Sequence, residues 1–319
     1  MDLEMKYVYA VYQENSFSQA AKKLFISQSA VSAVVRKAEQ EIGCQIFDRS
    51  TIPFTLTPEG RFYIESIEKI QKVERDMQAY FDDRKNLKVG HLSVGSSSFY
   101  SAYFLARMVK AFQKSYPGIH IEIKEGDGKE LTDSLSDGTL DFLFGALTQG
   151  EKETRSLLYG YEHLILAVPE NVEANRRLIN YQIPAEAIRS GAFLEDRFPP
   201  VPLWELRDCR FISLTKTGSD LYQRTLDICR NAGFTPQVTQ YLSQIMTAYY
   251  VAAAGGGAAF IRSSLFSMIQ EQKGLVYYKV DDPLTKRAIC LTYRKDRYIS
   301  HAMSAFLTFA AELPASYRR

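Results

Sequence analysis

The first 60 residues alternate between apolar and polar positions with the spacing of short α-helices. Apolar side chains recur every three or four residues over 3–14, which predicts a first helix. A second, shorter helix is expected over 16–25. Ser27 can cap a third helix over 28–42, which Gly43 would end. Two helices joined by so short a turn indicate a helix-turn-helix.

The third helix carries small and polar residues at its N-terminal end. Gln28, Ser29, Ser32 and Arg36 cluster on one side, while Ala30, Val31, Val34, Val35 and Ala38 can pack inward. Glutamine can form two hydrogen bonds with adenine, and serine and arginine can bind bases or phosphates. We therefore expect Ser27, Gln28, Ser29, Ser32 and Arg36 to contact DNA in the major groove. The alternative is an ordinary three-helix bundle with a solvated polar face.

Two short β-rich segments follow, over 46–49 and 54–56, and predict a hairpin, or wing. Arg49 is the candidate on this wing for a contact with the DNA backbone or minor groove. The alternative is a structural ion pair between Arg49 and Asp48 or Glu41.

Residues 58–82 predict one long helix, which Thr57 and Pro58 start well. Its apolar residues recur every seven positions between charged flanks, which is typical of a dimer seam; the alternative is a helix packed on its own chain. The seam residues are Tyr63, Ile70 and Met77, then Ser66, Val73 and Tyr80, with Ile67 and Phe81 widening the stripe. Residues 82–88 are polar and predict a hinge.

From Val89 onward, strands and helices alternate. The pattern predicts strands over 91–95, 119–124 and 140–144 with helices between them, and then a strand near 161–168. A second such unit follows, with strands over 209–214, 237–241 and 258–261. Strands over 276–278 and 288–293 are expected to return to the first unit, before a last helix over 297–312. Each unit is a parallel α/β sheet, whose ligands bind at the carboxyl ends of strands.

Composition excludes several classes of protein. The net charge is +2, and the first 60 residues hold six basic and seven acidic residues, so bulk charge does not indicate nucleic-acid binding. No signal peptide or stretch of 18 apolar residues is present, so we expect a cytoplasmic protein without contact to a membrane. Four dispersed histidines, no G-x-S-x-G, no Walker loop and no metal-ligand cluster argue against an enzyme, a metal or a cofactor. Four separated cysteines are expected to be buried thiols, with a Cys209–Cys229 redox pair as the alternative.

Several motifs in the N-terminal 62 residues occur in the order and spacing of a known family. They resemble the signature of LysR-type transcriptional regulators: Ser16-Phe17-Ser18-Gln19-Ala20-Ala21, Ser27-Gln28-Ser29-Ala30-Val31-Ser32, Ile46-Phe47-Asp48-Arg49 and Leu56-Thr57-Pro58-Glu59-Gly60. Ser29 stands where the family usually has proline, and Ala38 where it usually has leucine. The resemblance implies a winged helix-turn-helix, a linker helix that pairs subunits, and a two-lobed α/β effector domain similar to periplasmic binding proteins.

Such a two-lobed domain implies a ligand cleft. Ser96, Ser97 and Ser98 follow the first strand of one lobe, and Thr217 and Gly218 follow the first strand of the other. Helix N-termini present free N–H groups, which suit a small anion. We expect these five residues to bind an anionic metabolite, with Phe99, Tyr100 and Phe211 as apolar wall. The alternative is that they only cap helices.

The predicted organisation is a DNA-binding domain over 1–57, a linker helix over 58–82 and an effector domain over 89–319. Lobe I comprises 89–165 and 266–319, and lobe II comprises 166–265. The expected function is a sequence-specific regulator of transcription that responds to a small molecule, binds double-stranded DNA and assembles as a homodimer or homotetramer. One alternative is a regulator without an effector, whose C-terminal domain serves oligomerisation; a less favoured one is an α/β enzyme.

One stretch departs from the resemblance. About 40 residues separate Pro169 from Phe211, where the family usually has roughly half as many. This stretch could lengthen the rim of the cleft, cover the pocket or contact another subunit. The sequence does not distinguish between these three roles.

Overall fold

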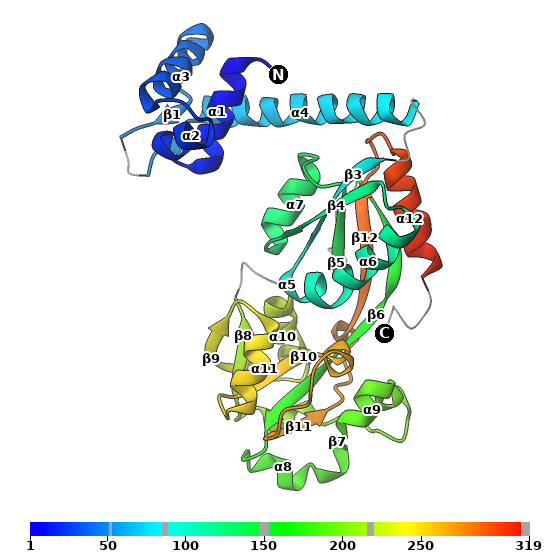
Figure 1. The fold of residues 1–319 in the computed structure, drawn as a ribbon. Helices are drawn as coiled ribbons and strands as arrows, with labels where there is room; N and C mark the ends of the chain where they lie inside the picture. Colours follow the sequence, from blue (N-terminus) through cyan, green and yellow to red (C-terminus); the bar gives the residue numbers. More distant parts are fainter. Residues whose placement is uncertain (51–52, 85–88, 147–152, 216–219, 314–319) are drawn as a thin grey trace. The chain divides into compact units, whose positions relative to one another are not determined.

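The structure, a computed structural model, describes residues 1–50, 53–84, 89–146, 153–215 and 220–313 (Figure 1). The chain divides into two compact units, Met1–Leu87 with Ser136–Thr139, and Lys88–Leu135 with Leu140–Arg319. The finer predicted boundaries at 57, 82 and 89 stay predictions.

The N-terminal unit begins with three short helices, α1 (Leu3–Glu14), α2 (Phe17–Lys23) and α3 (Gln28–Ile42). Each starts at a residue whose side-chain oxygen accepts a backbone N–H bond, namely Asp2, Ser16 and Ser27. Gly43 ends α3 with φ at +72°, a conformation that favours glycine. The helices expected from the periodicity, and the helix-turn-helix that they form, are therefore confirmed.

The wing is a two-stranded antiparallel hairpin, β1 (Phe47–Asp48) with β2 (Thr55–Leu56). Phe47 packs edge-on against Phe17 and Phe54, which ties the hairpin to α2. The prediction that Ala30 packs inward is wrong: it is exposed, because it lies about 100° around the helix from Val31, outside the face that buries Val31, Val35 and Ala38.

The long helix α4 (Pro58–Arg84) has two different faces. Ile64 and Ile67 are buried in the core of the N-terminal unit. Gly60 lies so close to the backbone that a Cβ there would sit 2.0 Å from the carbonyl oxygen of Ile46. At roughly 100° per residue, Phe62, Val73 and Tyr80 fall on the opposite face, and all three are exposed. Ile67 and the half-buried Tyr63 thus belong to the packing on their own chain, whereas Val73, Met77, Tyr80 and Phe81 of the predicted seam are exposed.

The second unit is built on one continuous sheet of two lobes. Its strand order is β4-β3-β5-β12-β6-β10-β8-β9, with β11 pairing β6 and β7. The long strand β6 joins the lobes, because its first part pairs with β12 and its last part with β10 and β11 (Figure 1). The strands are β3 (Gly90–Ser96), β4 (Ile119–Glu125), β5 (Phe142–Ala146), β6 (Thr154–Pro169), β7 (Gln182–Ile183), β8 (Arg210–Leu214), β9 (Gln237–Leu242), β10 (Ala258–Arg262), β11 (Leu275–Tyr278) and β12 (Lys286–Arg294).

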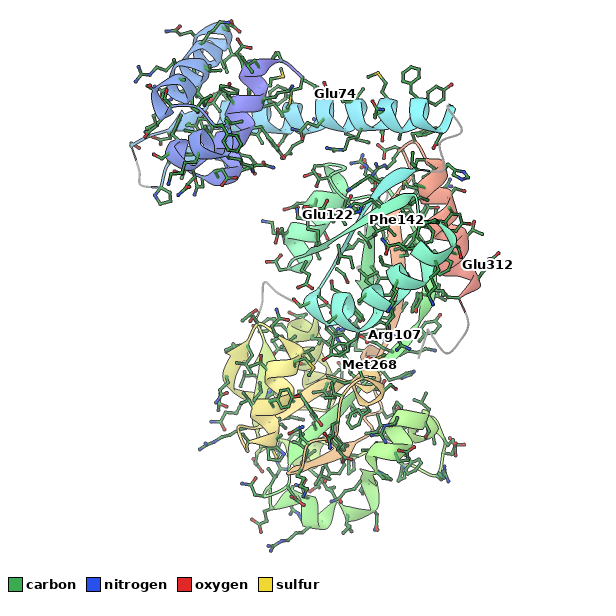
Figure 2. The ribbon with its side chains drawn as sticks, viewed as in Figure 1. Glu74, Arg107, Glu122, Phe142, Met268 and Glu312 are labelled. Carbon is green, nitrogen blue, oxygen red and sulfur yellow. The ribbon has the colours of Figure 1, made fainter. Side chains whose placement is uncertain are left out.

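Helices cover the strands of both lobes, as the alternation predicts. Phe142, labelled in Figure 2, packs against Phe306 of α12 and Tyr293 in the core of the first lobe. The run from Ser98 to Ser115 is one helix with a π-helical segment, Ser101–Leu105, in its middle. The α-helices are α5 (Ser98–Tyr100), α6 (Ala106–Ser115), α7 (Gly128–Ser136), α8 (Ala174–Arg177), α9 (Ala185–Ser190), α10 (Leu221–Asn231), α11 (Ile245–Ala253) and α12 (His301–Glu312).

One predicted connection is wrong. Residues 276–278 do not return to the first lobe, because β11 pairs with the last residues of β6 and with β7. The chain crosses back only after β11, and β12 then pairs with β5 and with the first part of β6. Sequence alternation identifies a strand but not its neighbour, which depends on contacts distant along the chain.

Candidate functional site

The N-terminal end of α3 presents an exposed polar surface. Gln28 and Ser29 are exposed, and Ser27 is held as the helix cap, its Oγ accepting the N–H of Ala30. Ser18 donates a hydrogen bond to Oε1 of Gln28 at 2.8 Å, which orients the amide. The Gln28 amide nitrogen has no hydrogen-bond partner among the residues that the structure describes. This group is therefore positioned and available to bind a base edge.

Arg36 and Arg49, the two candidate arginines, differ in their contacts. Arg36 is exposed on α3 and, within the described ranges, has no ion-pair partner, while Ser32 one turn earlier is half-buried. Arg49 instead bonds Oε2 of Glu39 at 3.2 Å and stacks over the ring of Phe17. The alternative of a structural ion pair thus describes Arg49, although with a different acidic partner from those expected.

Glu39 is the residue that organises the start of the wing. Its Oε1 accepts the backbone N–H groups of Ile46 and Phe47, and its Oε2 accepts from Arg49. One carboxylate therefore fixes the chain where it leaves α3 and enters β1. No local pattern in the sequence indicates this role for Glu39, since its three partners lie seven to ten residues away.

The second unit contains a cleft of about 350 Å³ between its lobes. Ser97, Ser98 and Phe99 line it at the carboxyl end of β3, as expected. Opposite them, Thr215 follows β8, and Gln244 and Ile245 begin α11. The cleft therefore lies where parallel strands of both lobes end.

Two other residues predicted for the ligand site, Ser96 and Phe211, are not found in the lining of the cleft. Ser96 is fully buried and donates its hydroxyl to the carbonyl of Phe144 at 2.6 Å. Phe211 is fully buried against Phe234, because alternation along β8 turns it into the core of the second lobe. Neither lines the cleft, which corrects the sequence-based expectation. Thr217 and Gly218 lie outside the described residues.

Two helix N-termini meet at the cleft. The helix that starts at Ser98 has Ser97 as its N-cap residue, and α11 has Gln244, and neither cap side chain bonds its own helix. The Oγ of Ser97 is buried and has no hydrogen-bond partner in the described part of the chain. Free N–H groups and this hydroxyl make the cleft rich in hydrogen-bond donors.

Arg262, the last residue of β10, supplies a positive charge to the same cleft. Only 5% of its surface is exposed, and its Nε and Nη1 atoms have no hydrogen-bond partner among the described residues. Its guanidinium carbon lies 4.7 Å from the ring centre of Phe99 and 4.4 Å from that of Tyr100. Sequence reasoning missed this residue, although an arginine directly after the apolar run 258–261 was a usable signal.

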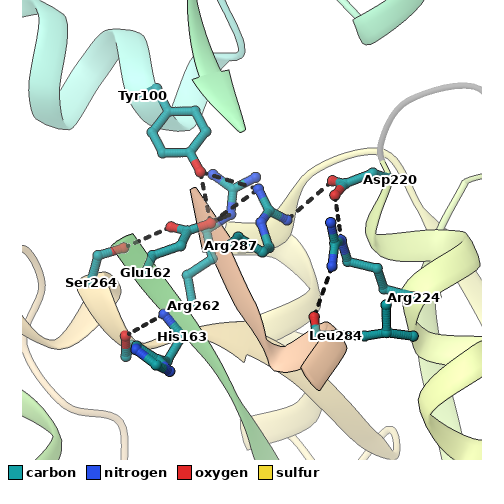
Figure 3. A network of polar contacts seen from close by, with 10 residues as sticks. Tyr100, Glu162, His163, Asp220, Arg224, Arg262, Ser264, Leu284 and Arg287 are labelled. Carbon is teal, nitrogen blue, oxygen red and sulfur yellow. Dashed lines mark hydrogen bonds and ion pairs between the residues drawn. The ribbon is translucent and has the colours of Figure 1, made fainter. Parts of the chain in front are cut away.

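Behind Arg262 lies a buried polar network (Figure 3). Glu162 lies 3.8 Å from Nε of Arg262, accepts a hydrogen bond from the Tyr100 hydroxyl at 2.7 Å and pairs with Arg287 at 3.0 Å. Arg287 also pairs with Asp220, which bonds Arg224. Three guanidinium groups here face two carboxylates, so the network carries one positive charge in excess.

The network sets the protonation of its members. Burial raises the pKa of the Tyr100 phenol well above its ordinary value, so that it stays a hydrogen-bond donor. Burial also acts to raise the pKa of Asp220, but Arg287 and Arg224 outweigh it and hold that pKa below its ordinary value. The Asp220 carboxylate is therefore expected to be ionised at neutral pH.

Metal binding, membrane insertion and thiol chemistry find no support in the described residues. No cluster of metal-binding side chains occurs in the described ranges, and no described helix is long and apolar enough to cross a membrane. Cys209 and Cys229 are both free and buried, and burial raises the pKa of each thiol, to about 12 for Cys229. These thiols are therefore poor nucleophiles, and the structure does not join them.

Comparison with known proteins identifies both parts of the chain. Residues 3–61 match the bacterial regulatory helix-turn-helix protein family of the LysR type. Residues 85–315 match the LysR substrate binding domain. The two matches adjoin the linker helix and together account for most of the chain.

Relatives align over nearly the whole length. An uncharacterised HTH-type transcriptional regulator, YcgK of Bacillus subtilis, is 28% identical over 98% of this chain and 94% of its own. The HTH-type regulator BenM of Acinetobacter baylyi is 23% identical over 95% and 93%.

Solved structures share the fold. Full-length CbnR complexed with its target DNA has a TM-score of 0.64 at 18% identity, covering 97% of this chain and 99% of that one. A full-length OxyR variant from Pseudomonas aeruginosa has a TM-score of 0.66 at 21% identity, covering 98% and 95%. The chain belongs to the LysR family of DNA-binding transcriptional regulators, with an N-terminal helix-turn-helix and a C-terminal effector-binding domain, and is a regulator rather than an enzyme.

Proposed function

We propose that this regulator responds to a small anionic metabolite bound in the cleft between Ser97 and Gln244. The buried guanidinium of Arg262 carries the proposal. A buried guanidinium whose Nε and Nη1 lack hydrogen bonds is costly, even with Glu162 at 3.8 Å from Nε, and a bound carboxylate or similar anion in the cleft would accept a hydrogen bond from Nη1. The hydroxyl of Ser97 and the two helix N-termini supply further donors to the same anion.

The rim of the cleft limits the ligand's charge. Glu125 and Asp127 line the cleft and are exposed, and one oxygen of Asp127 caps α7 through the N–H of Glu130. A second negative charge on the ligand would be repelled here by about 1 kcal/mol at 4 Å in water. These carboxylates favour an effector with one anionic end and a neutral or cationic remainder.

The test is a titration of the full-length protein with a panel of monocarboxylates, dicarboxylates and amino acids, followed by isothermal calorimetry. Arg262→Met keeps the length of the side chain and removes its charge. A lost charge-assisted hydrogen bond costs about 1.5–3 kcal/mol, so the Kd of a bound anion should rise about ten- to a hundred-fold. Arg230→Met, at an exposed position of α10, is the matched control and should leave the Kd unchanged.

Anion binding that is equally tight in Arg262→Met would refute this cleft as the effector site. The double change Ser97→Ala and Ser98→Ala gives a second measurement, because it should weaken the ligand-dependent change in expression. An unchanged ligand-dependent change in expression in that variant would show that the two serines do not belong to the effector site.

For the DNA-binding domain, we propose base contacts by Gln28, with Ser29 and Ser32 beside it, and a phosphate contact by Arg36. Ser27 and Arg49 are assigned structural roles, as helix cap and as partner of Glu39. The exposed stripe of Phe62, Val73, Met77, Tyr80 and Phe81 on α4 is proposed as the surface that pairs two copies of the chain. The predicted site of action is the cytoplasm, where bacterial DNA is found.

A second candidate function is a regulator without an effector, whose C-terminal domain serves assembly alone. A complete lack of stabilisation or heat with every anion of the panel, in the wild type and in Arg262→Met alike, would favour it.

A further inference from the structure

A second cavity of about 320 Å³ lies in the effector domain, apart from the cleft. It opens between the helical segment that carries Tyr100 and Phe104, the strand β6 and residues 188–194. No residue that lines it also lines the cleft, among those that the structure describes. Its size lies at the lower end of the range for small-molecule sites, about 300–1,000 Å³.

One wall of this cavity comes from the stretch between Pro169 and Phe211, which is longer here than the family resemblance leads us to expect. Residues 188–191, at the end of α9, and Phe193 and Leu194 line it. Phe193 is buried and packs edge-on against the His163 ring, and Arg189 donates its Nε–H to the carbonyl of Phe266 at 3.1 Å. These residues are therefore held in place as one wall of the cavity.

The lining is mostly apolar and aromatic. Tyr100, Phe104, Tyr159, Ile188 and Phe193 are among the residues that line it. A lining with several aromatic rings suits an apolar aromatic ligand, because burial of the ligand's apolar surface contributes roughly 25 cal/mol per Å².

The charges that reach the cavity are already balanced. Glu162 lines it, but its carboxylate is bonded by Tyr100, Arg287 and Ser264. Arg189, at the rim, is paired with Glu186. A ligand with a full charge would find no free counter-charge among these groups, so the chemistry favours a neutral molecule.

His163 and Ser263 offer hydrogen bonds to such a molecule. Burial, and then Lys286, lower the pKa of His163, so its imidazole is neutral at pH 7 and has one donor and one acceptor. Its ring nitrogens have no hydrogen-bond partner among the described residues. Ser263 accepts the backbone N–H of His163 through its Oγ at 3.3 Å, and its own hydroxyl proton remains to be donated.

We propose that this cavity is a second ligand site, which binds a neutral, largely aromatic molecule with a hydroxyl or N–H group directed at His163 and Ser263. The site does not depend on the anion cleft. Arg262 and the Tyr100 ring separate the two, since Arg262 lines the cleft and Tyr100 lines the cavity.

The test uses 1-naphthol as probe, which is neutral at pH 7, and 1-naphthoate as its anionic counterpart. Calorimetry with the full-length protein should give saturable binding of 1-naphthol, at least ten-fold tighter than that of 1-naphthoate, which is about 1.4 kcal/mol or more. Ser267→Trp places a large ring at an exposed position on the rim of the cavity and should weaken 1-naphthol binding at least ten-fold. Ser304→Trp, at an exposed position of α12, is the matched control and should bind as the wild type does.

Leu194→Trp provides a second blocking variant on the opposite, added wall, in case Ser267→Trp does not fold, and circular dichroism checks both. The proposal is overturned if 1-naphthol does not bind at millimolar concentration, if both blocking variants bind it as the wild type does, or if 1-naphthoate binds more tightly at a site that they block. Binding of 1-naphthol in a protein that shows no anion binding would refute the proposed cleft and leave this site standing.

Discussion

Nη2 of Arg287 lies 3.0 Å from Oε1 of Glu162, and the two side chains are 1% and 4% exposed. The residues are direct neighbours across the ladder of β12 and β6. Their pair lies where β6 passes from one lobe into the other, close to both the cleft and the second cavity. A buried pair at this point links the lobes by charge as well as by backbone hydrogen bonds.

Removal of Arg287 alone should destabilise the protein strongly. Arg287→Met leaves the buried carboxylate of Glu162 without its ion-pair partner at 3.0 Å and removes one of the two arginines that pair with the half-buried Asp220, and breaking a buried pair costs about 3–5 kcal/mol. The double variant with Glu162→Leu should recover part of the loss, because it removes one of the orphaned charges. Thermal unfolding followed by circular dichroism measures both, with Arg230→Met as the exposed control. A wild-type melting temperature in Arg287→Met would contradict the structural role of the pair.

Asp220 should make stability depend on pH in the acid range. Its folded-state pKa lies below the ordinary value of about 3.9, so its carboxylate stabilises the fold above that pH. That contribution is lost as the pH falls through the folded-state pKa. The difference in melting temperature between the wild type and Asp220→Asn should therefore shrink from about pH 6 towards about pH 3. A difference that is constant over this range would argue against the ion pair with Arg287.

Gln28→Ala should lose preference for a DNA sequence while keeping nonspecific affinity. The amide contacts base edges in the proposed complex, whereas nonspecific binding comes from phosphate contacts and depends on salt. Fluorescence anisotropy with a duplex selected by the wild type, and with a scrambled duplex, separates the two. Arg36→Gln serves as comparison. It should weaken binding to both duplexes alike and lower the slope of log affinity against log salt concentration by about one. Equal loss on both duplexes in Gln28→Ala would exclude recognition of bases.

Val73→Lys should prevent two copies of the chain from pairing through α4. Val73 is 66% exposed in the single chain and lies on the stripe with Phe62 and Tyr80, so a lysine there would place a charge in the proposed seam. Sedimentation velocity should show a smaller species, and affinity for a duplex with two half-sites should fall. Val73→Ile keeps the position apolar and should sediment as the wild type does. If both variants sediment alike, another surface must pair the subunits.

The sequence by itself determined the elements that depend on near neighbours. The helices α1, α2 and α3 follow from apolar spacing and from caps such as Ser16 and Ser27, whose partners lie within a few residues. The α/β alternation of the second unit and the position of Ser97 and Ser98 after β3 follow in the same way. The family motif in residues 3–62 then indicated the kind of regulator.

Only the tertiary structure decided which distant residues meet. Arg262 contacts Phe99 and lies beside Glu162, residues 163 and 100 positions earlier, and no local pattern specifies such contacts. The same reason explains why Phe211 lies in the core and why β11 pairs within the second lobe. Which face of a strand is buried, and which strand lies next to it, depend on what packs against that strand. The wall that residues 188–194 give to the second cavity likewise exists only once β6 and the helix from Ser98 have come together around it.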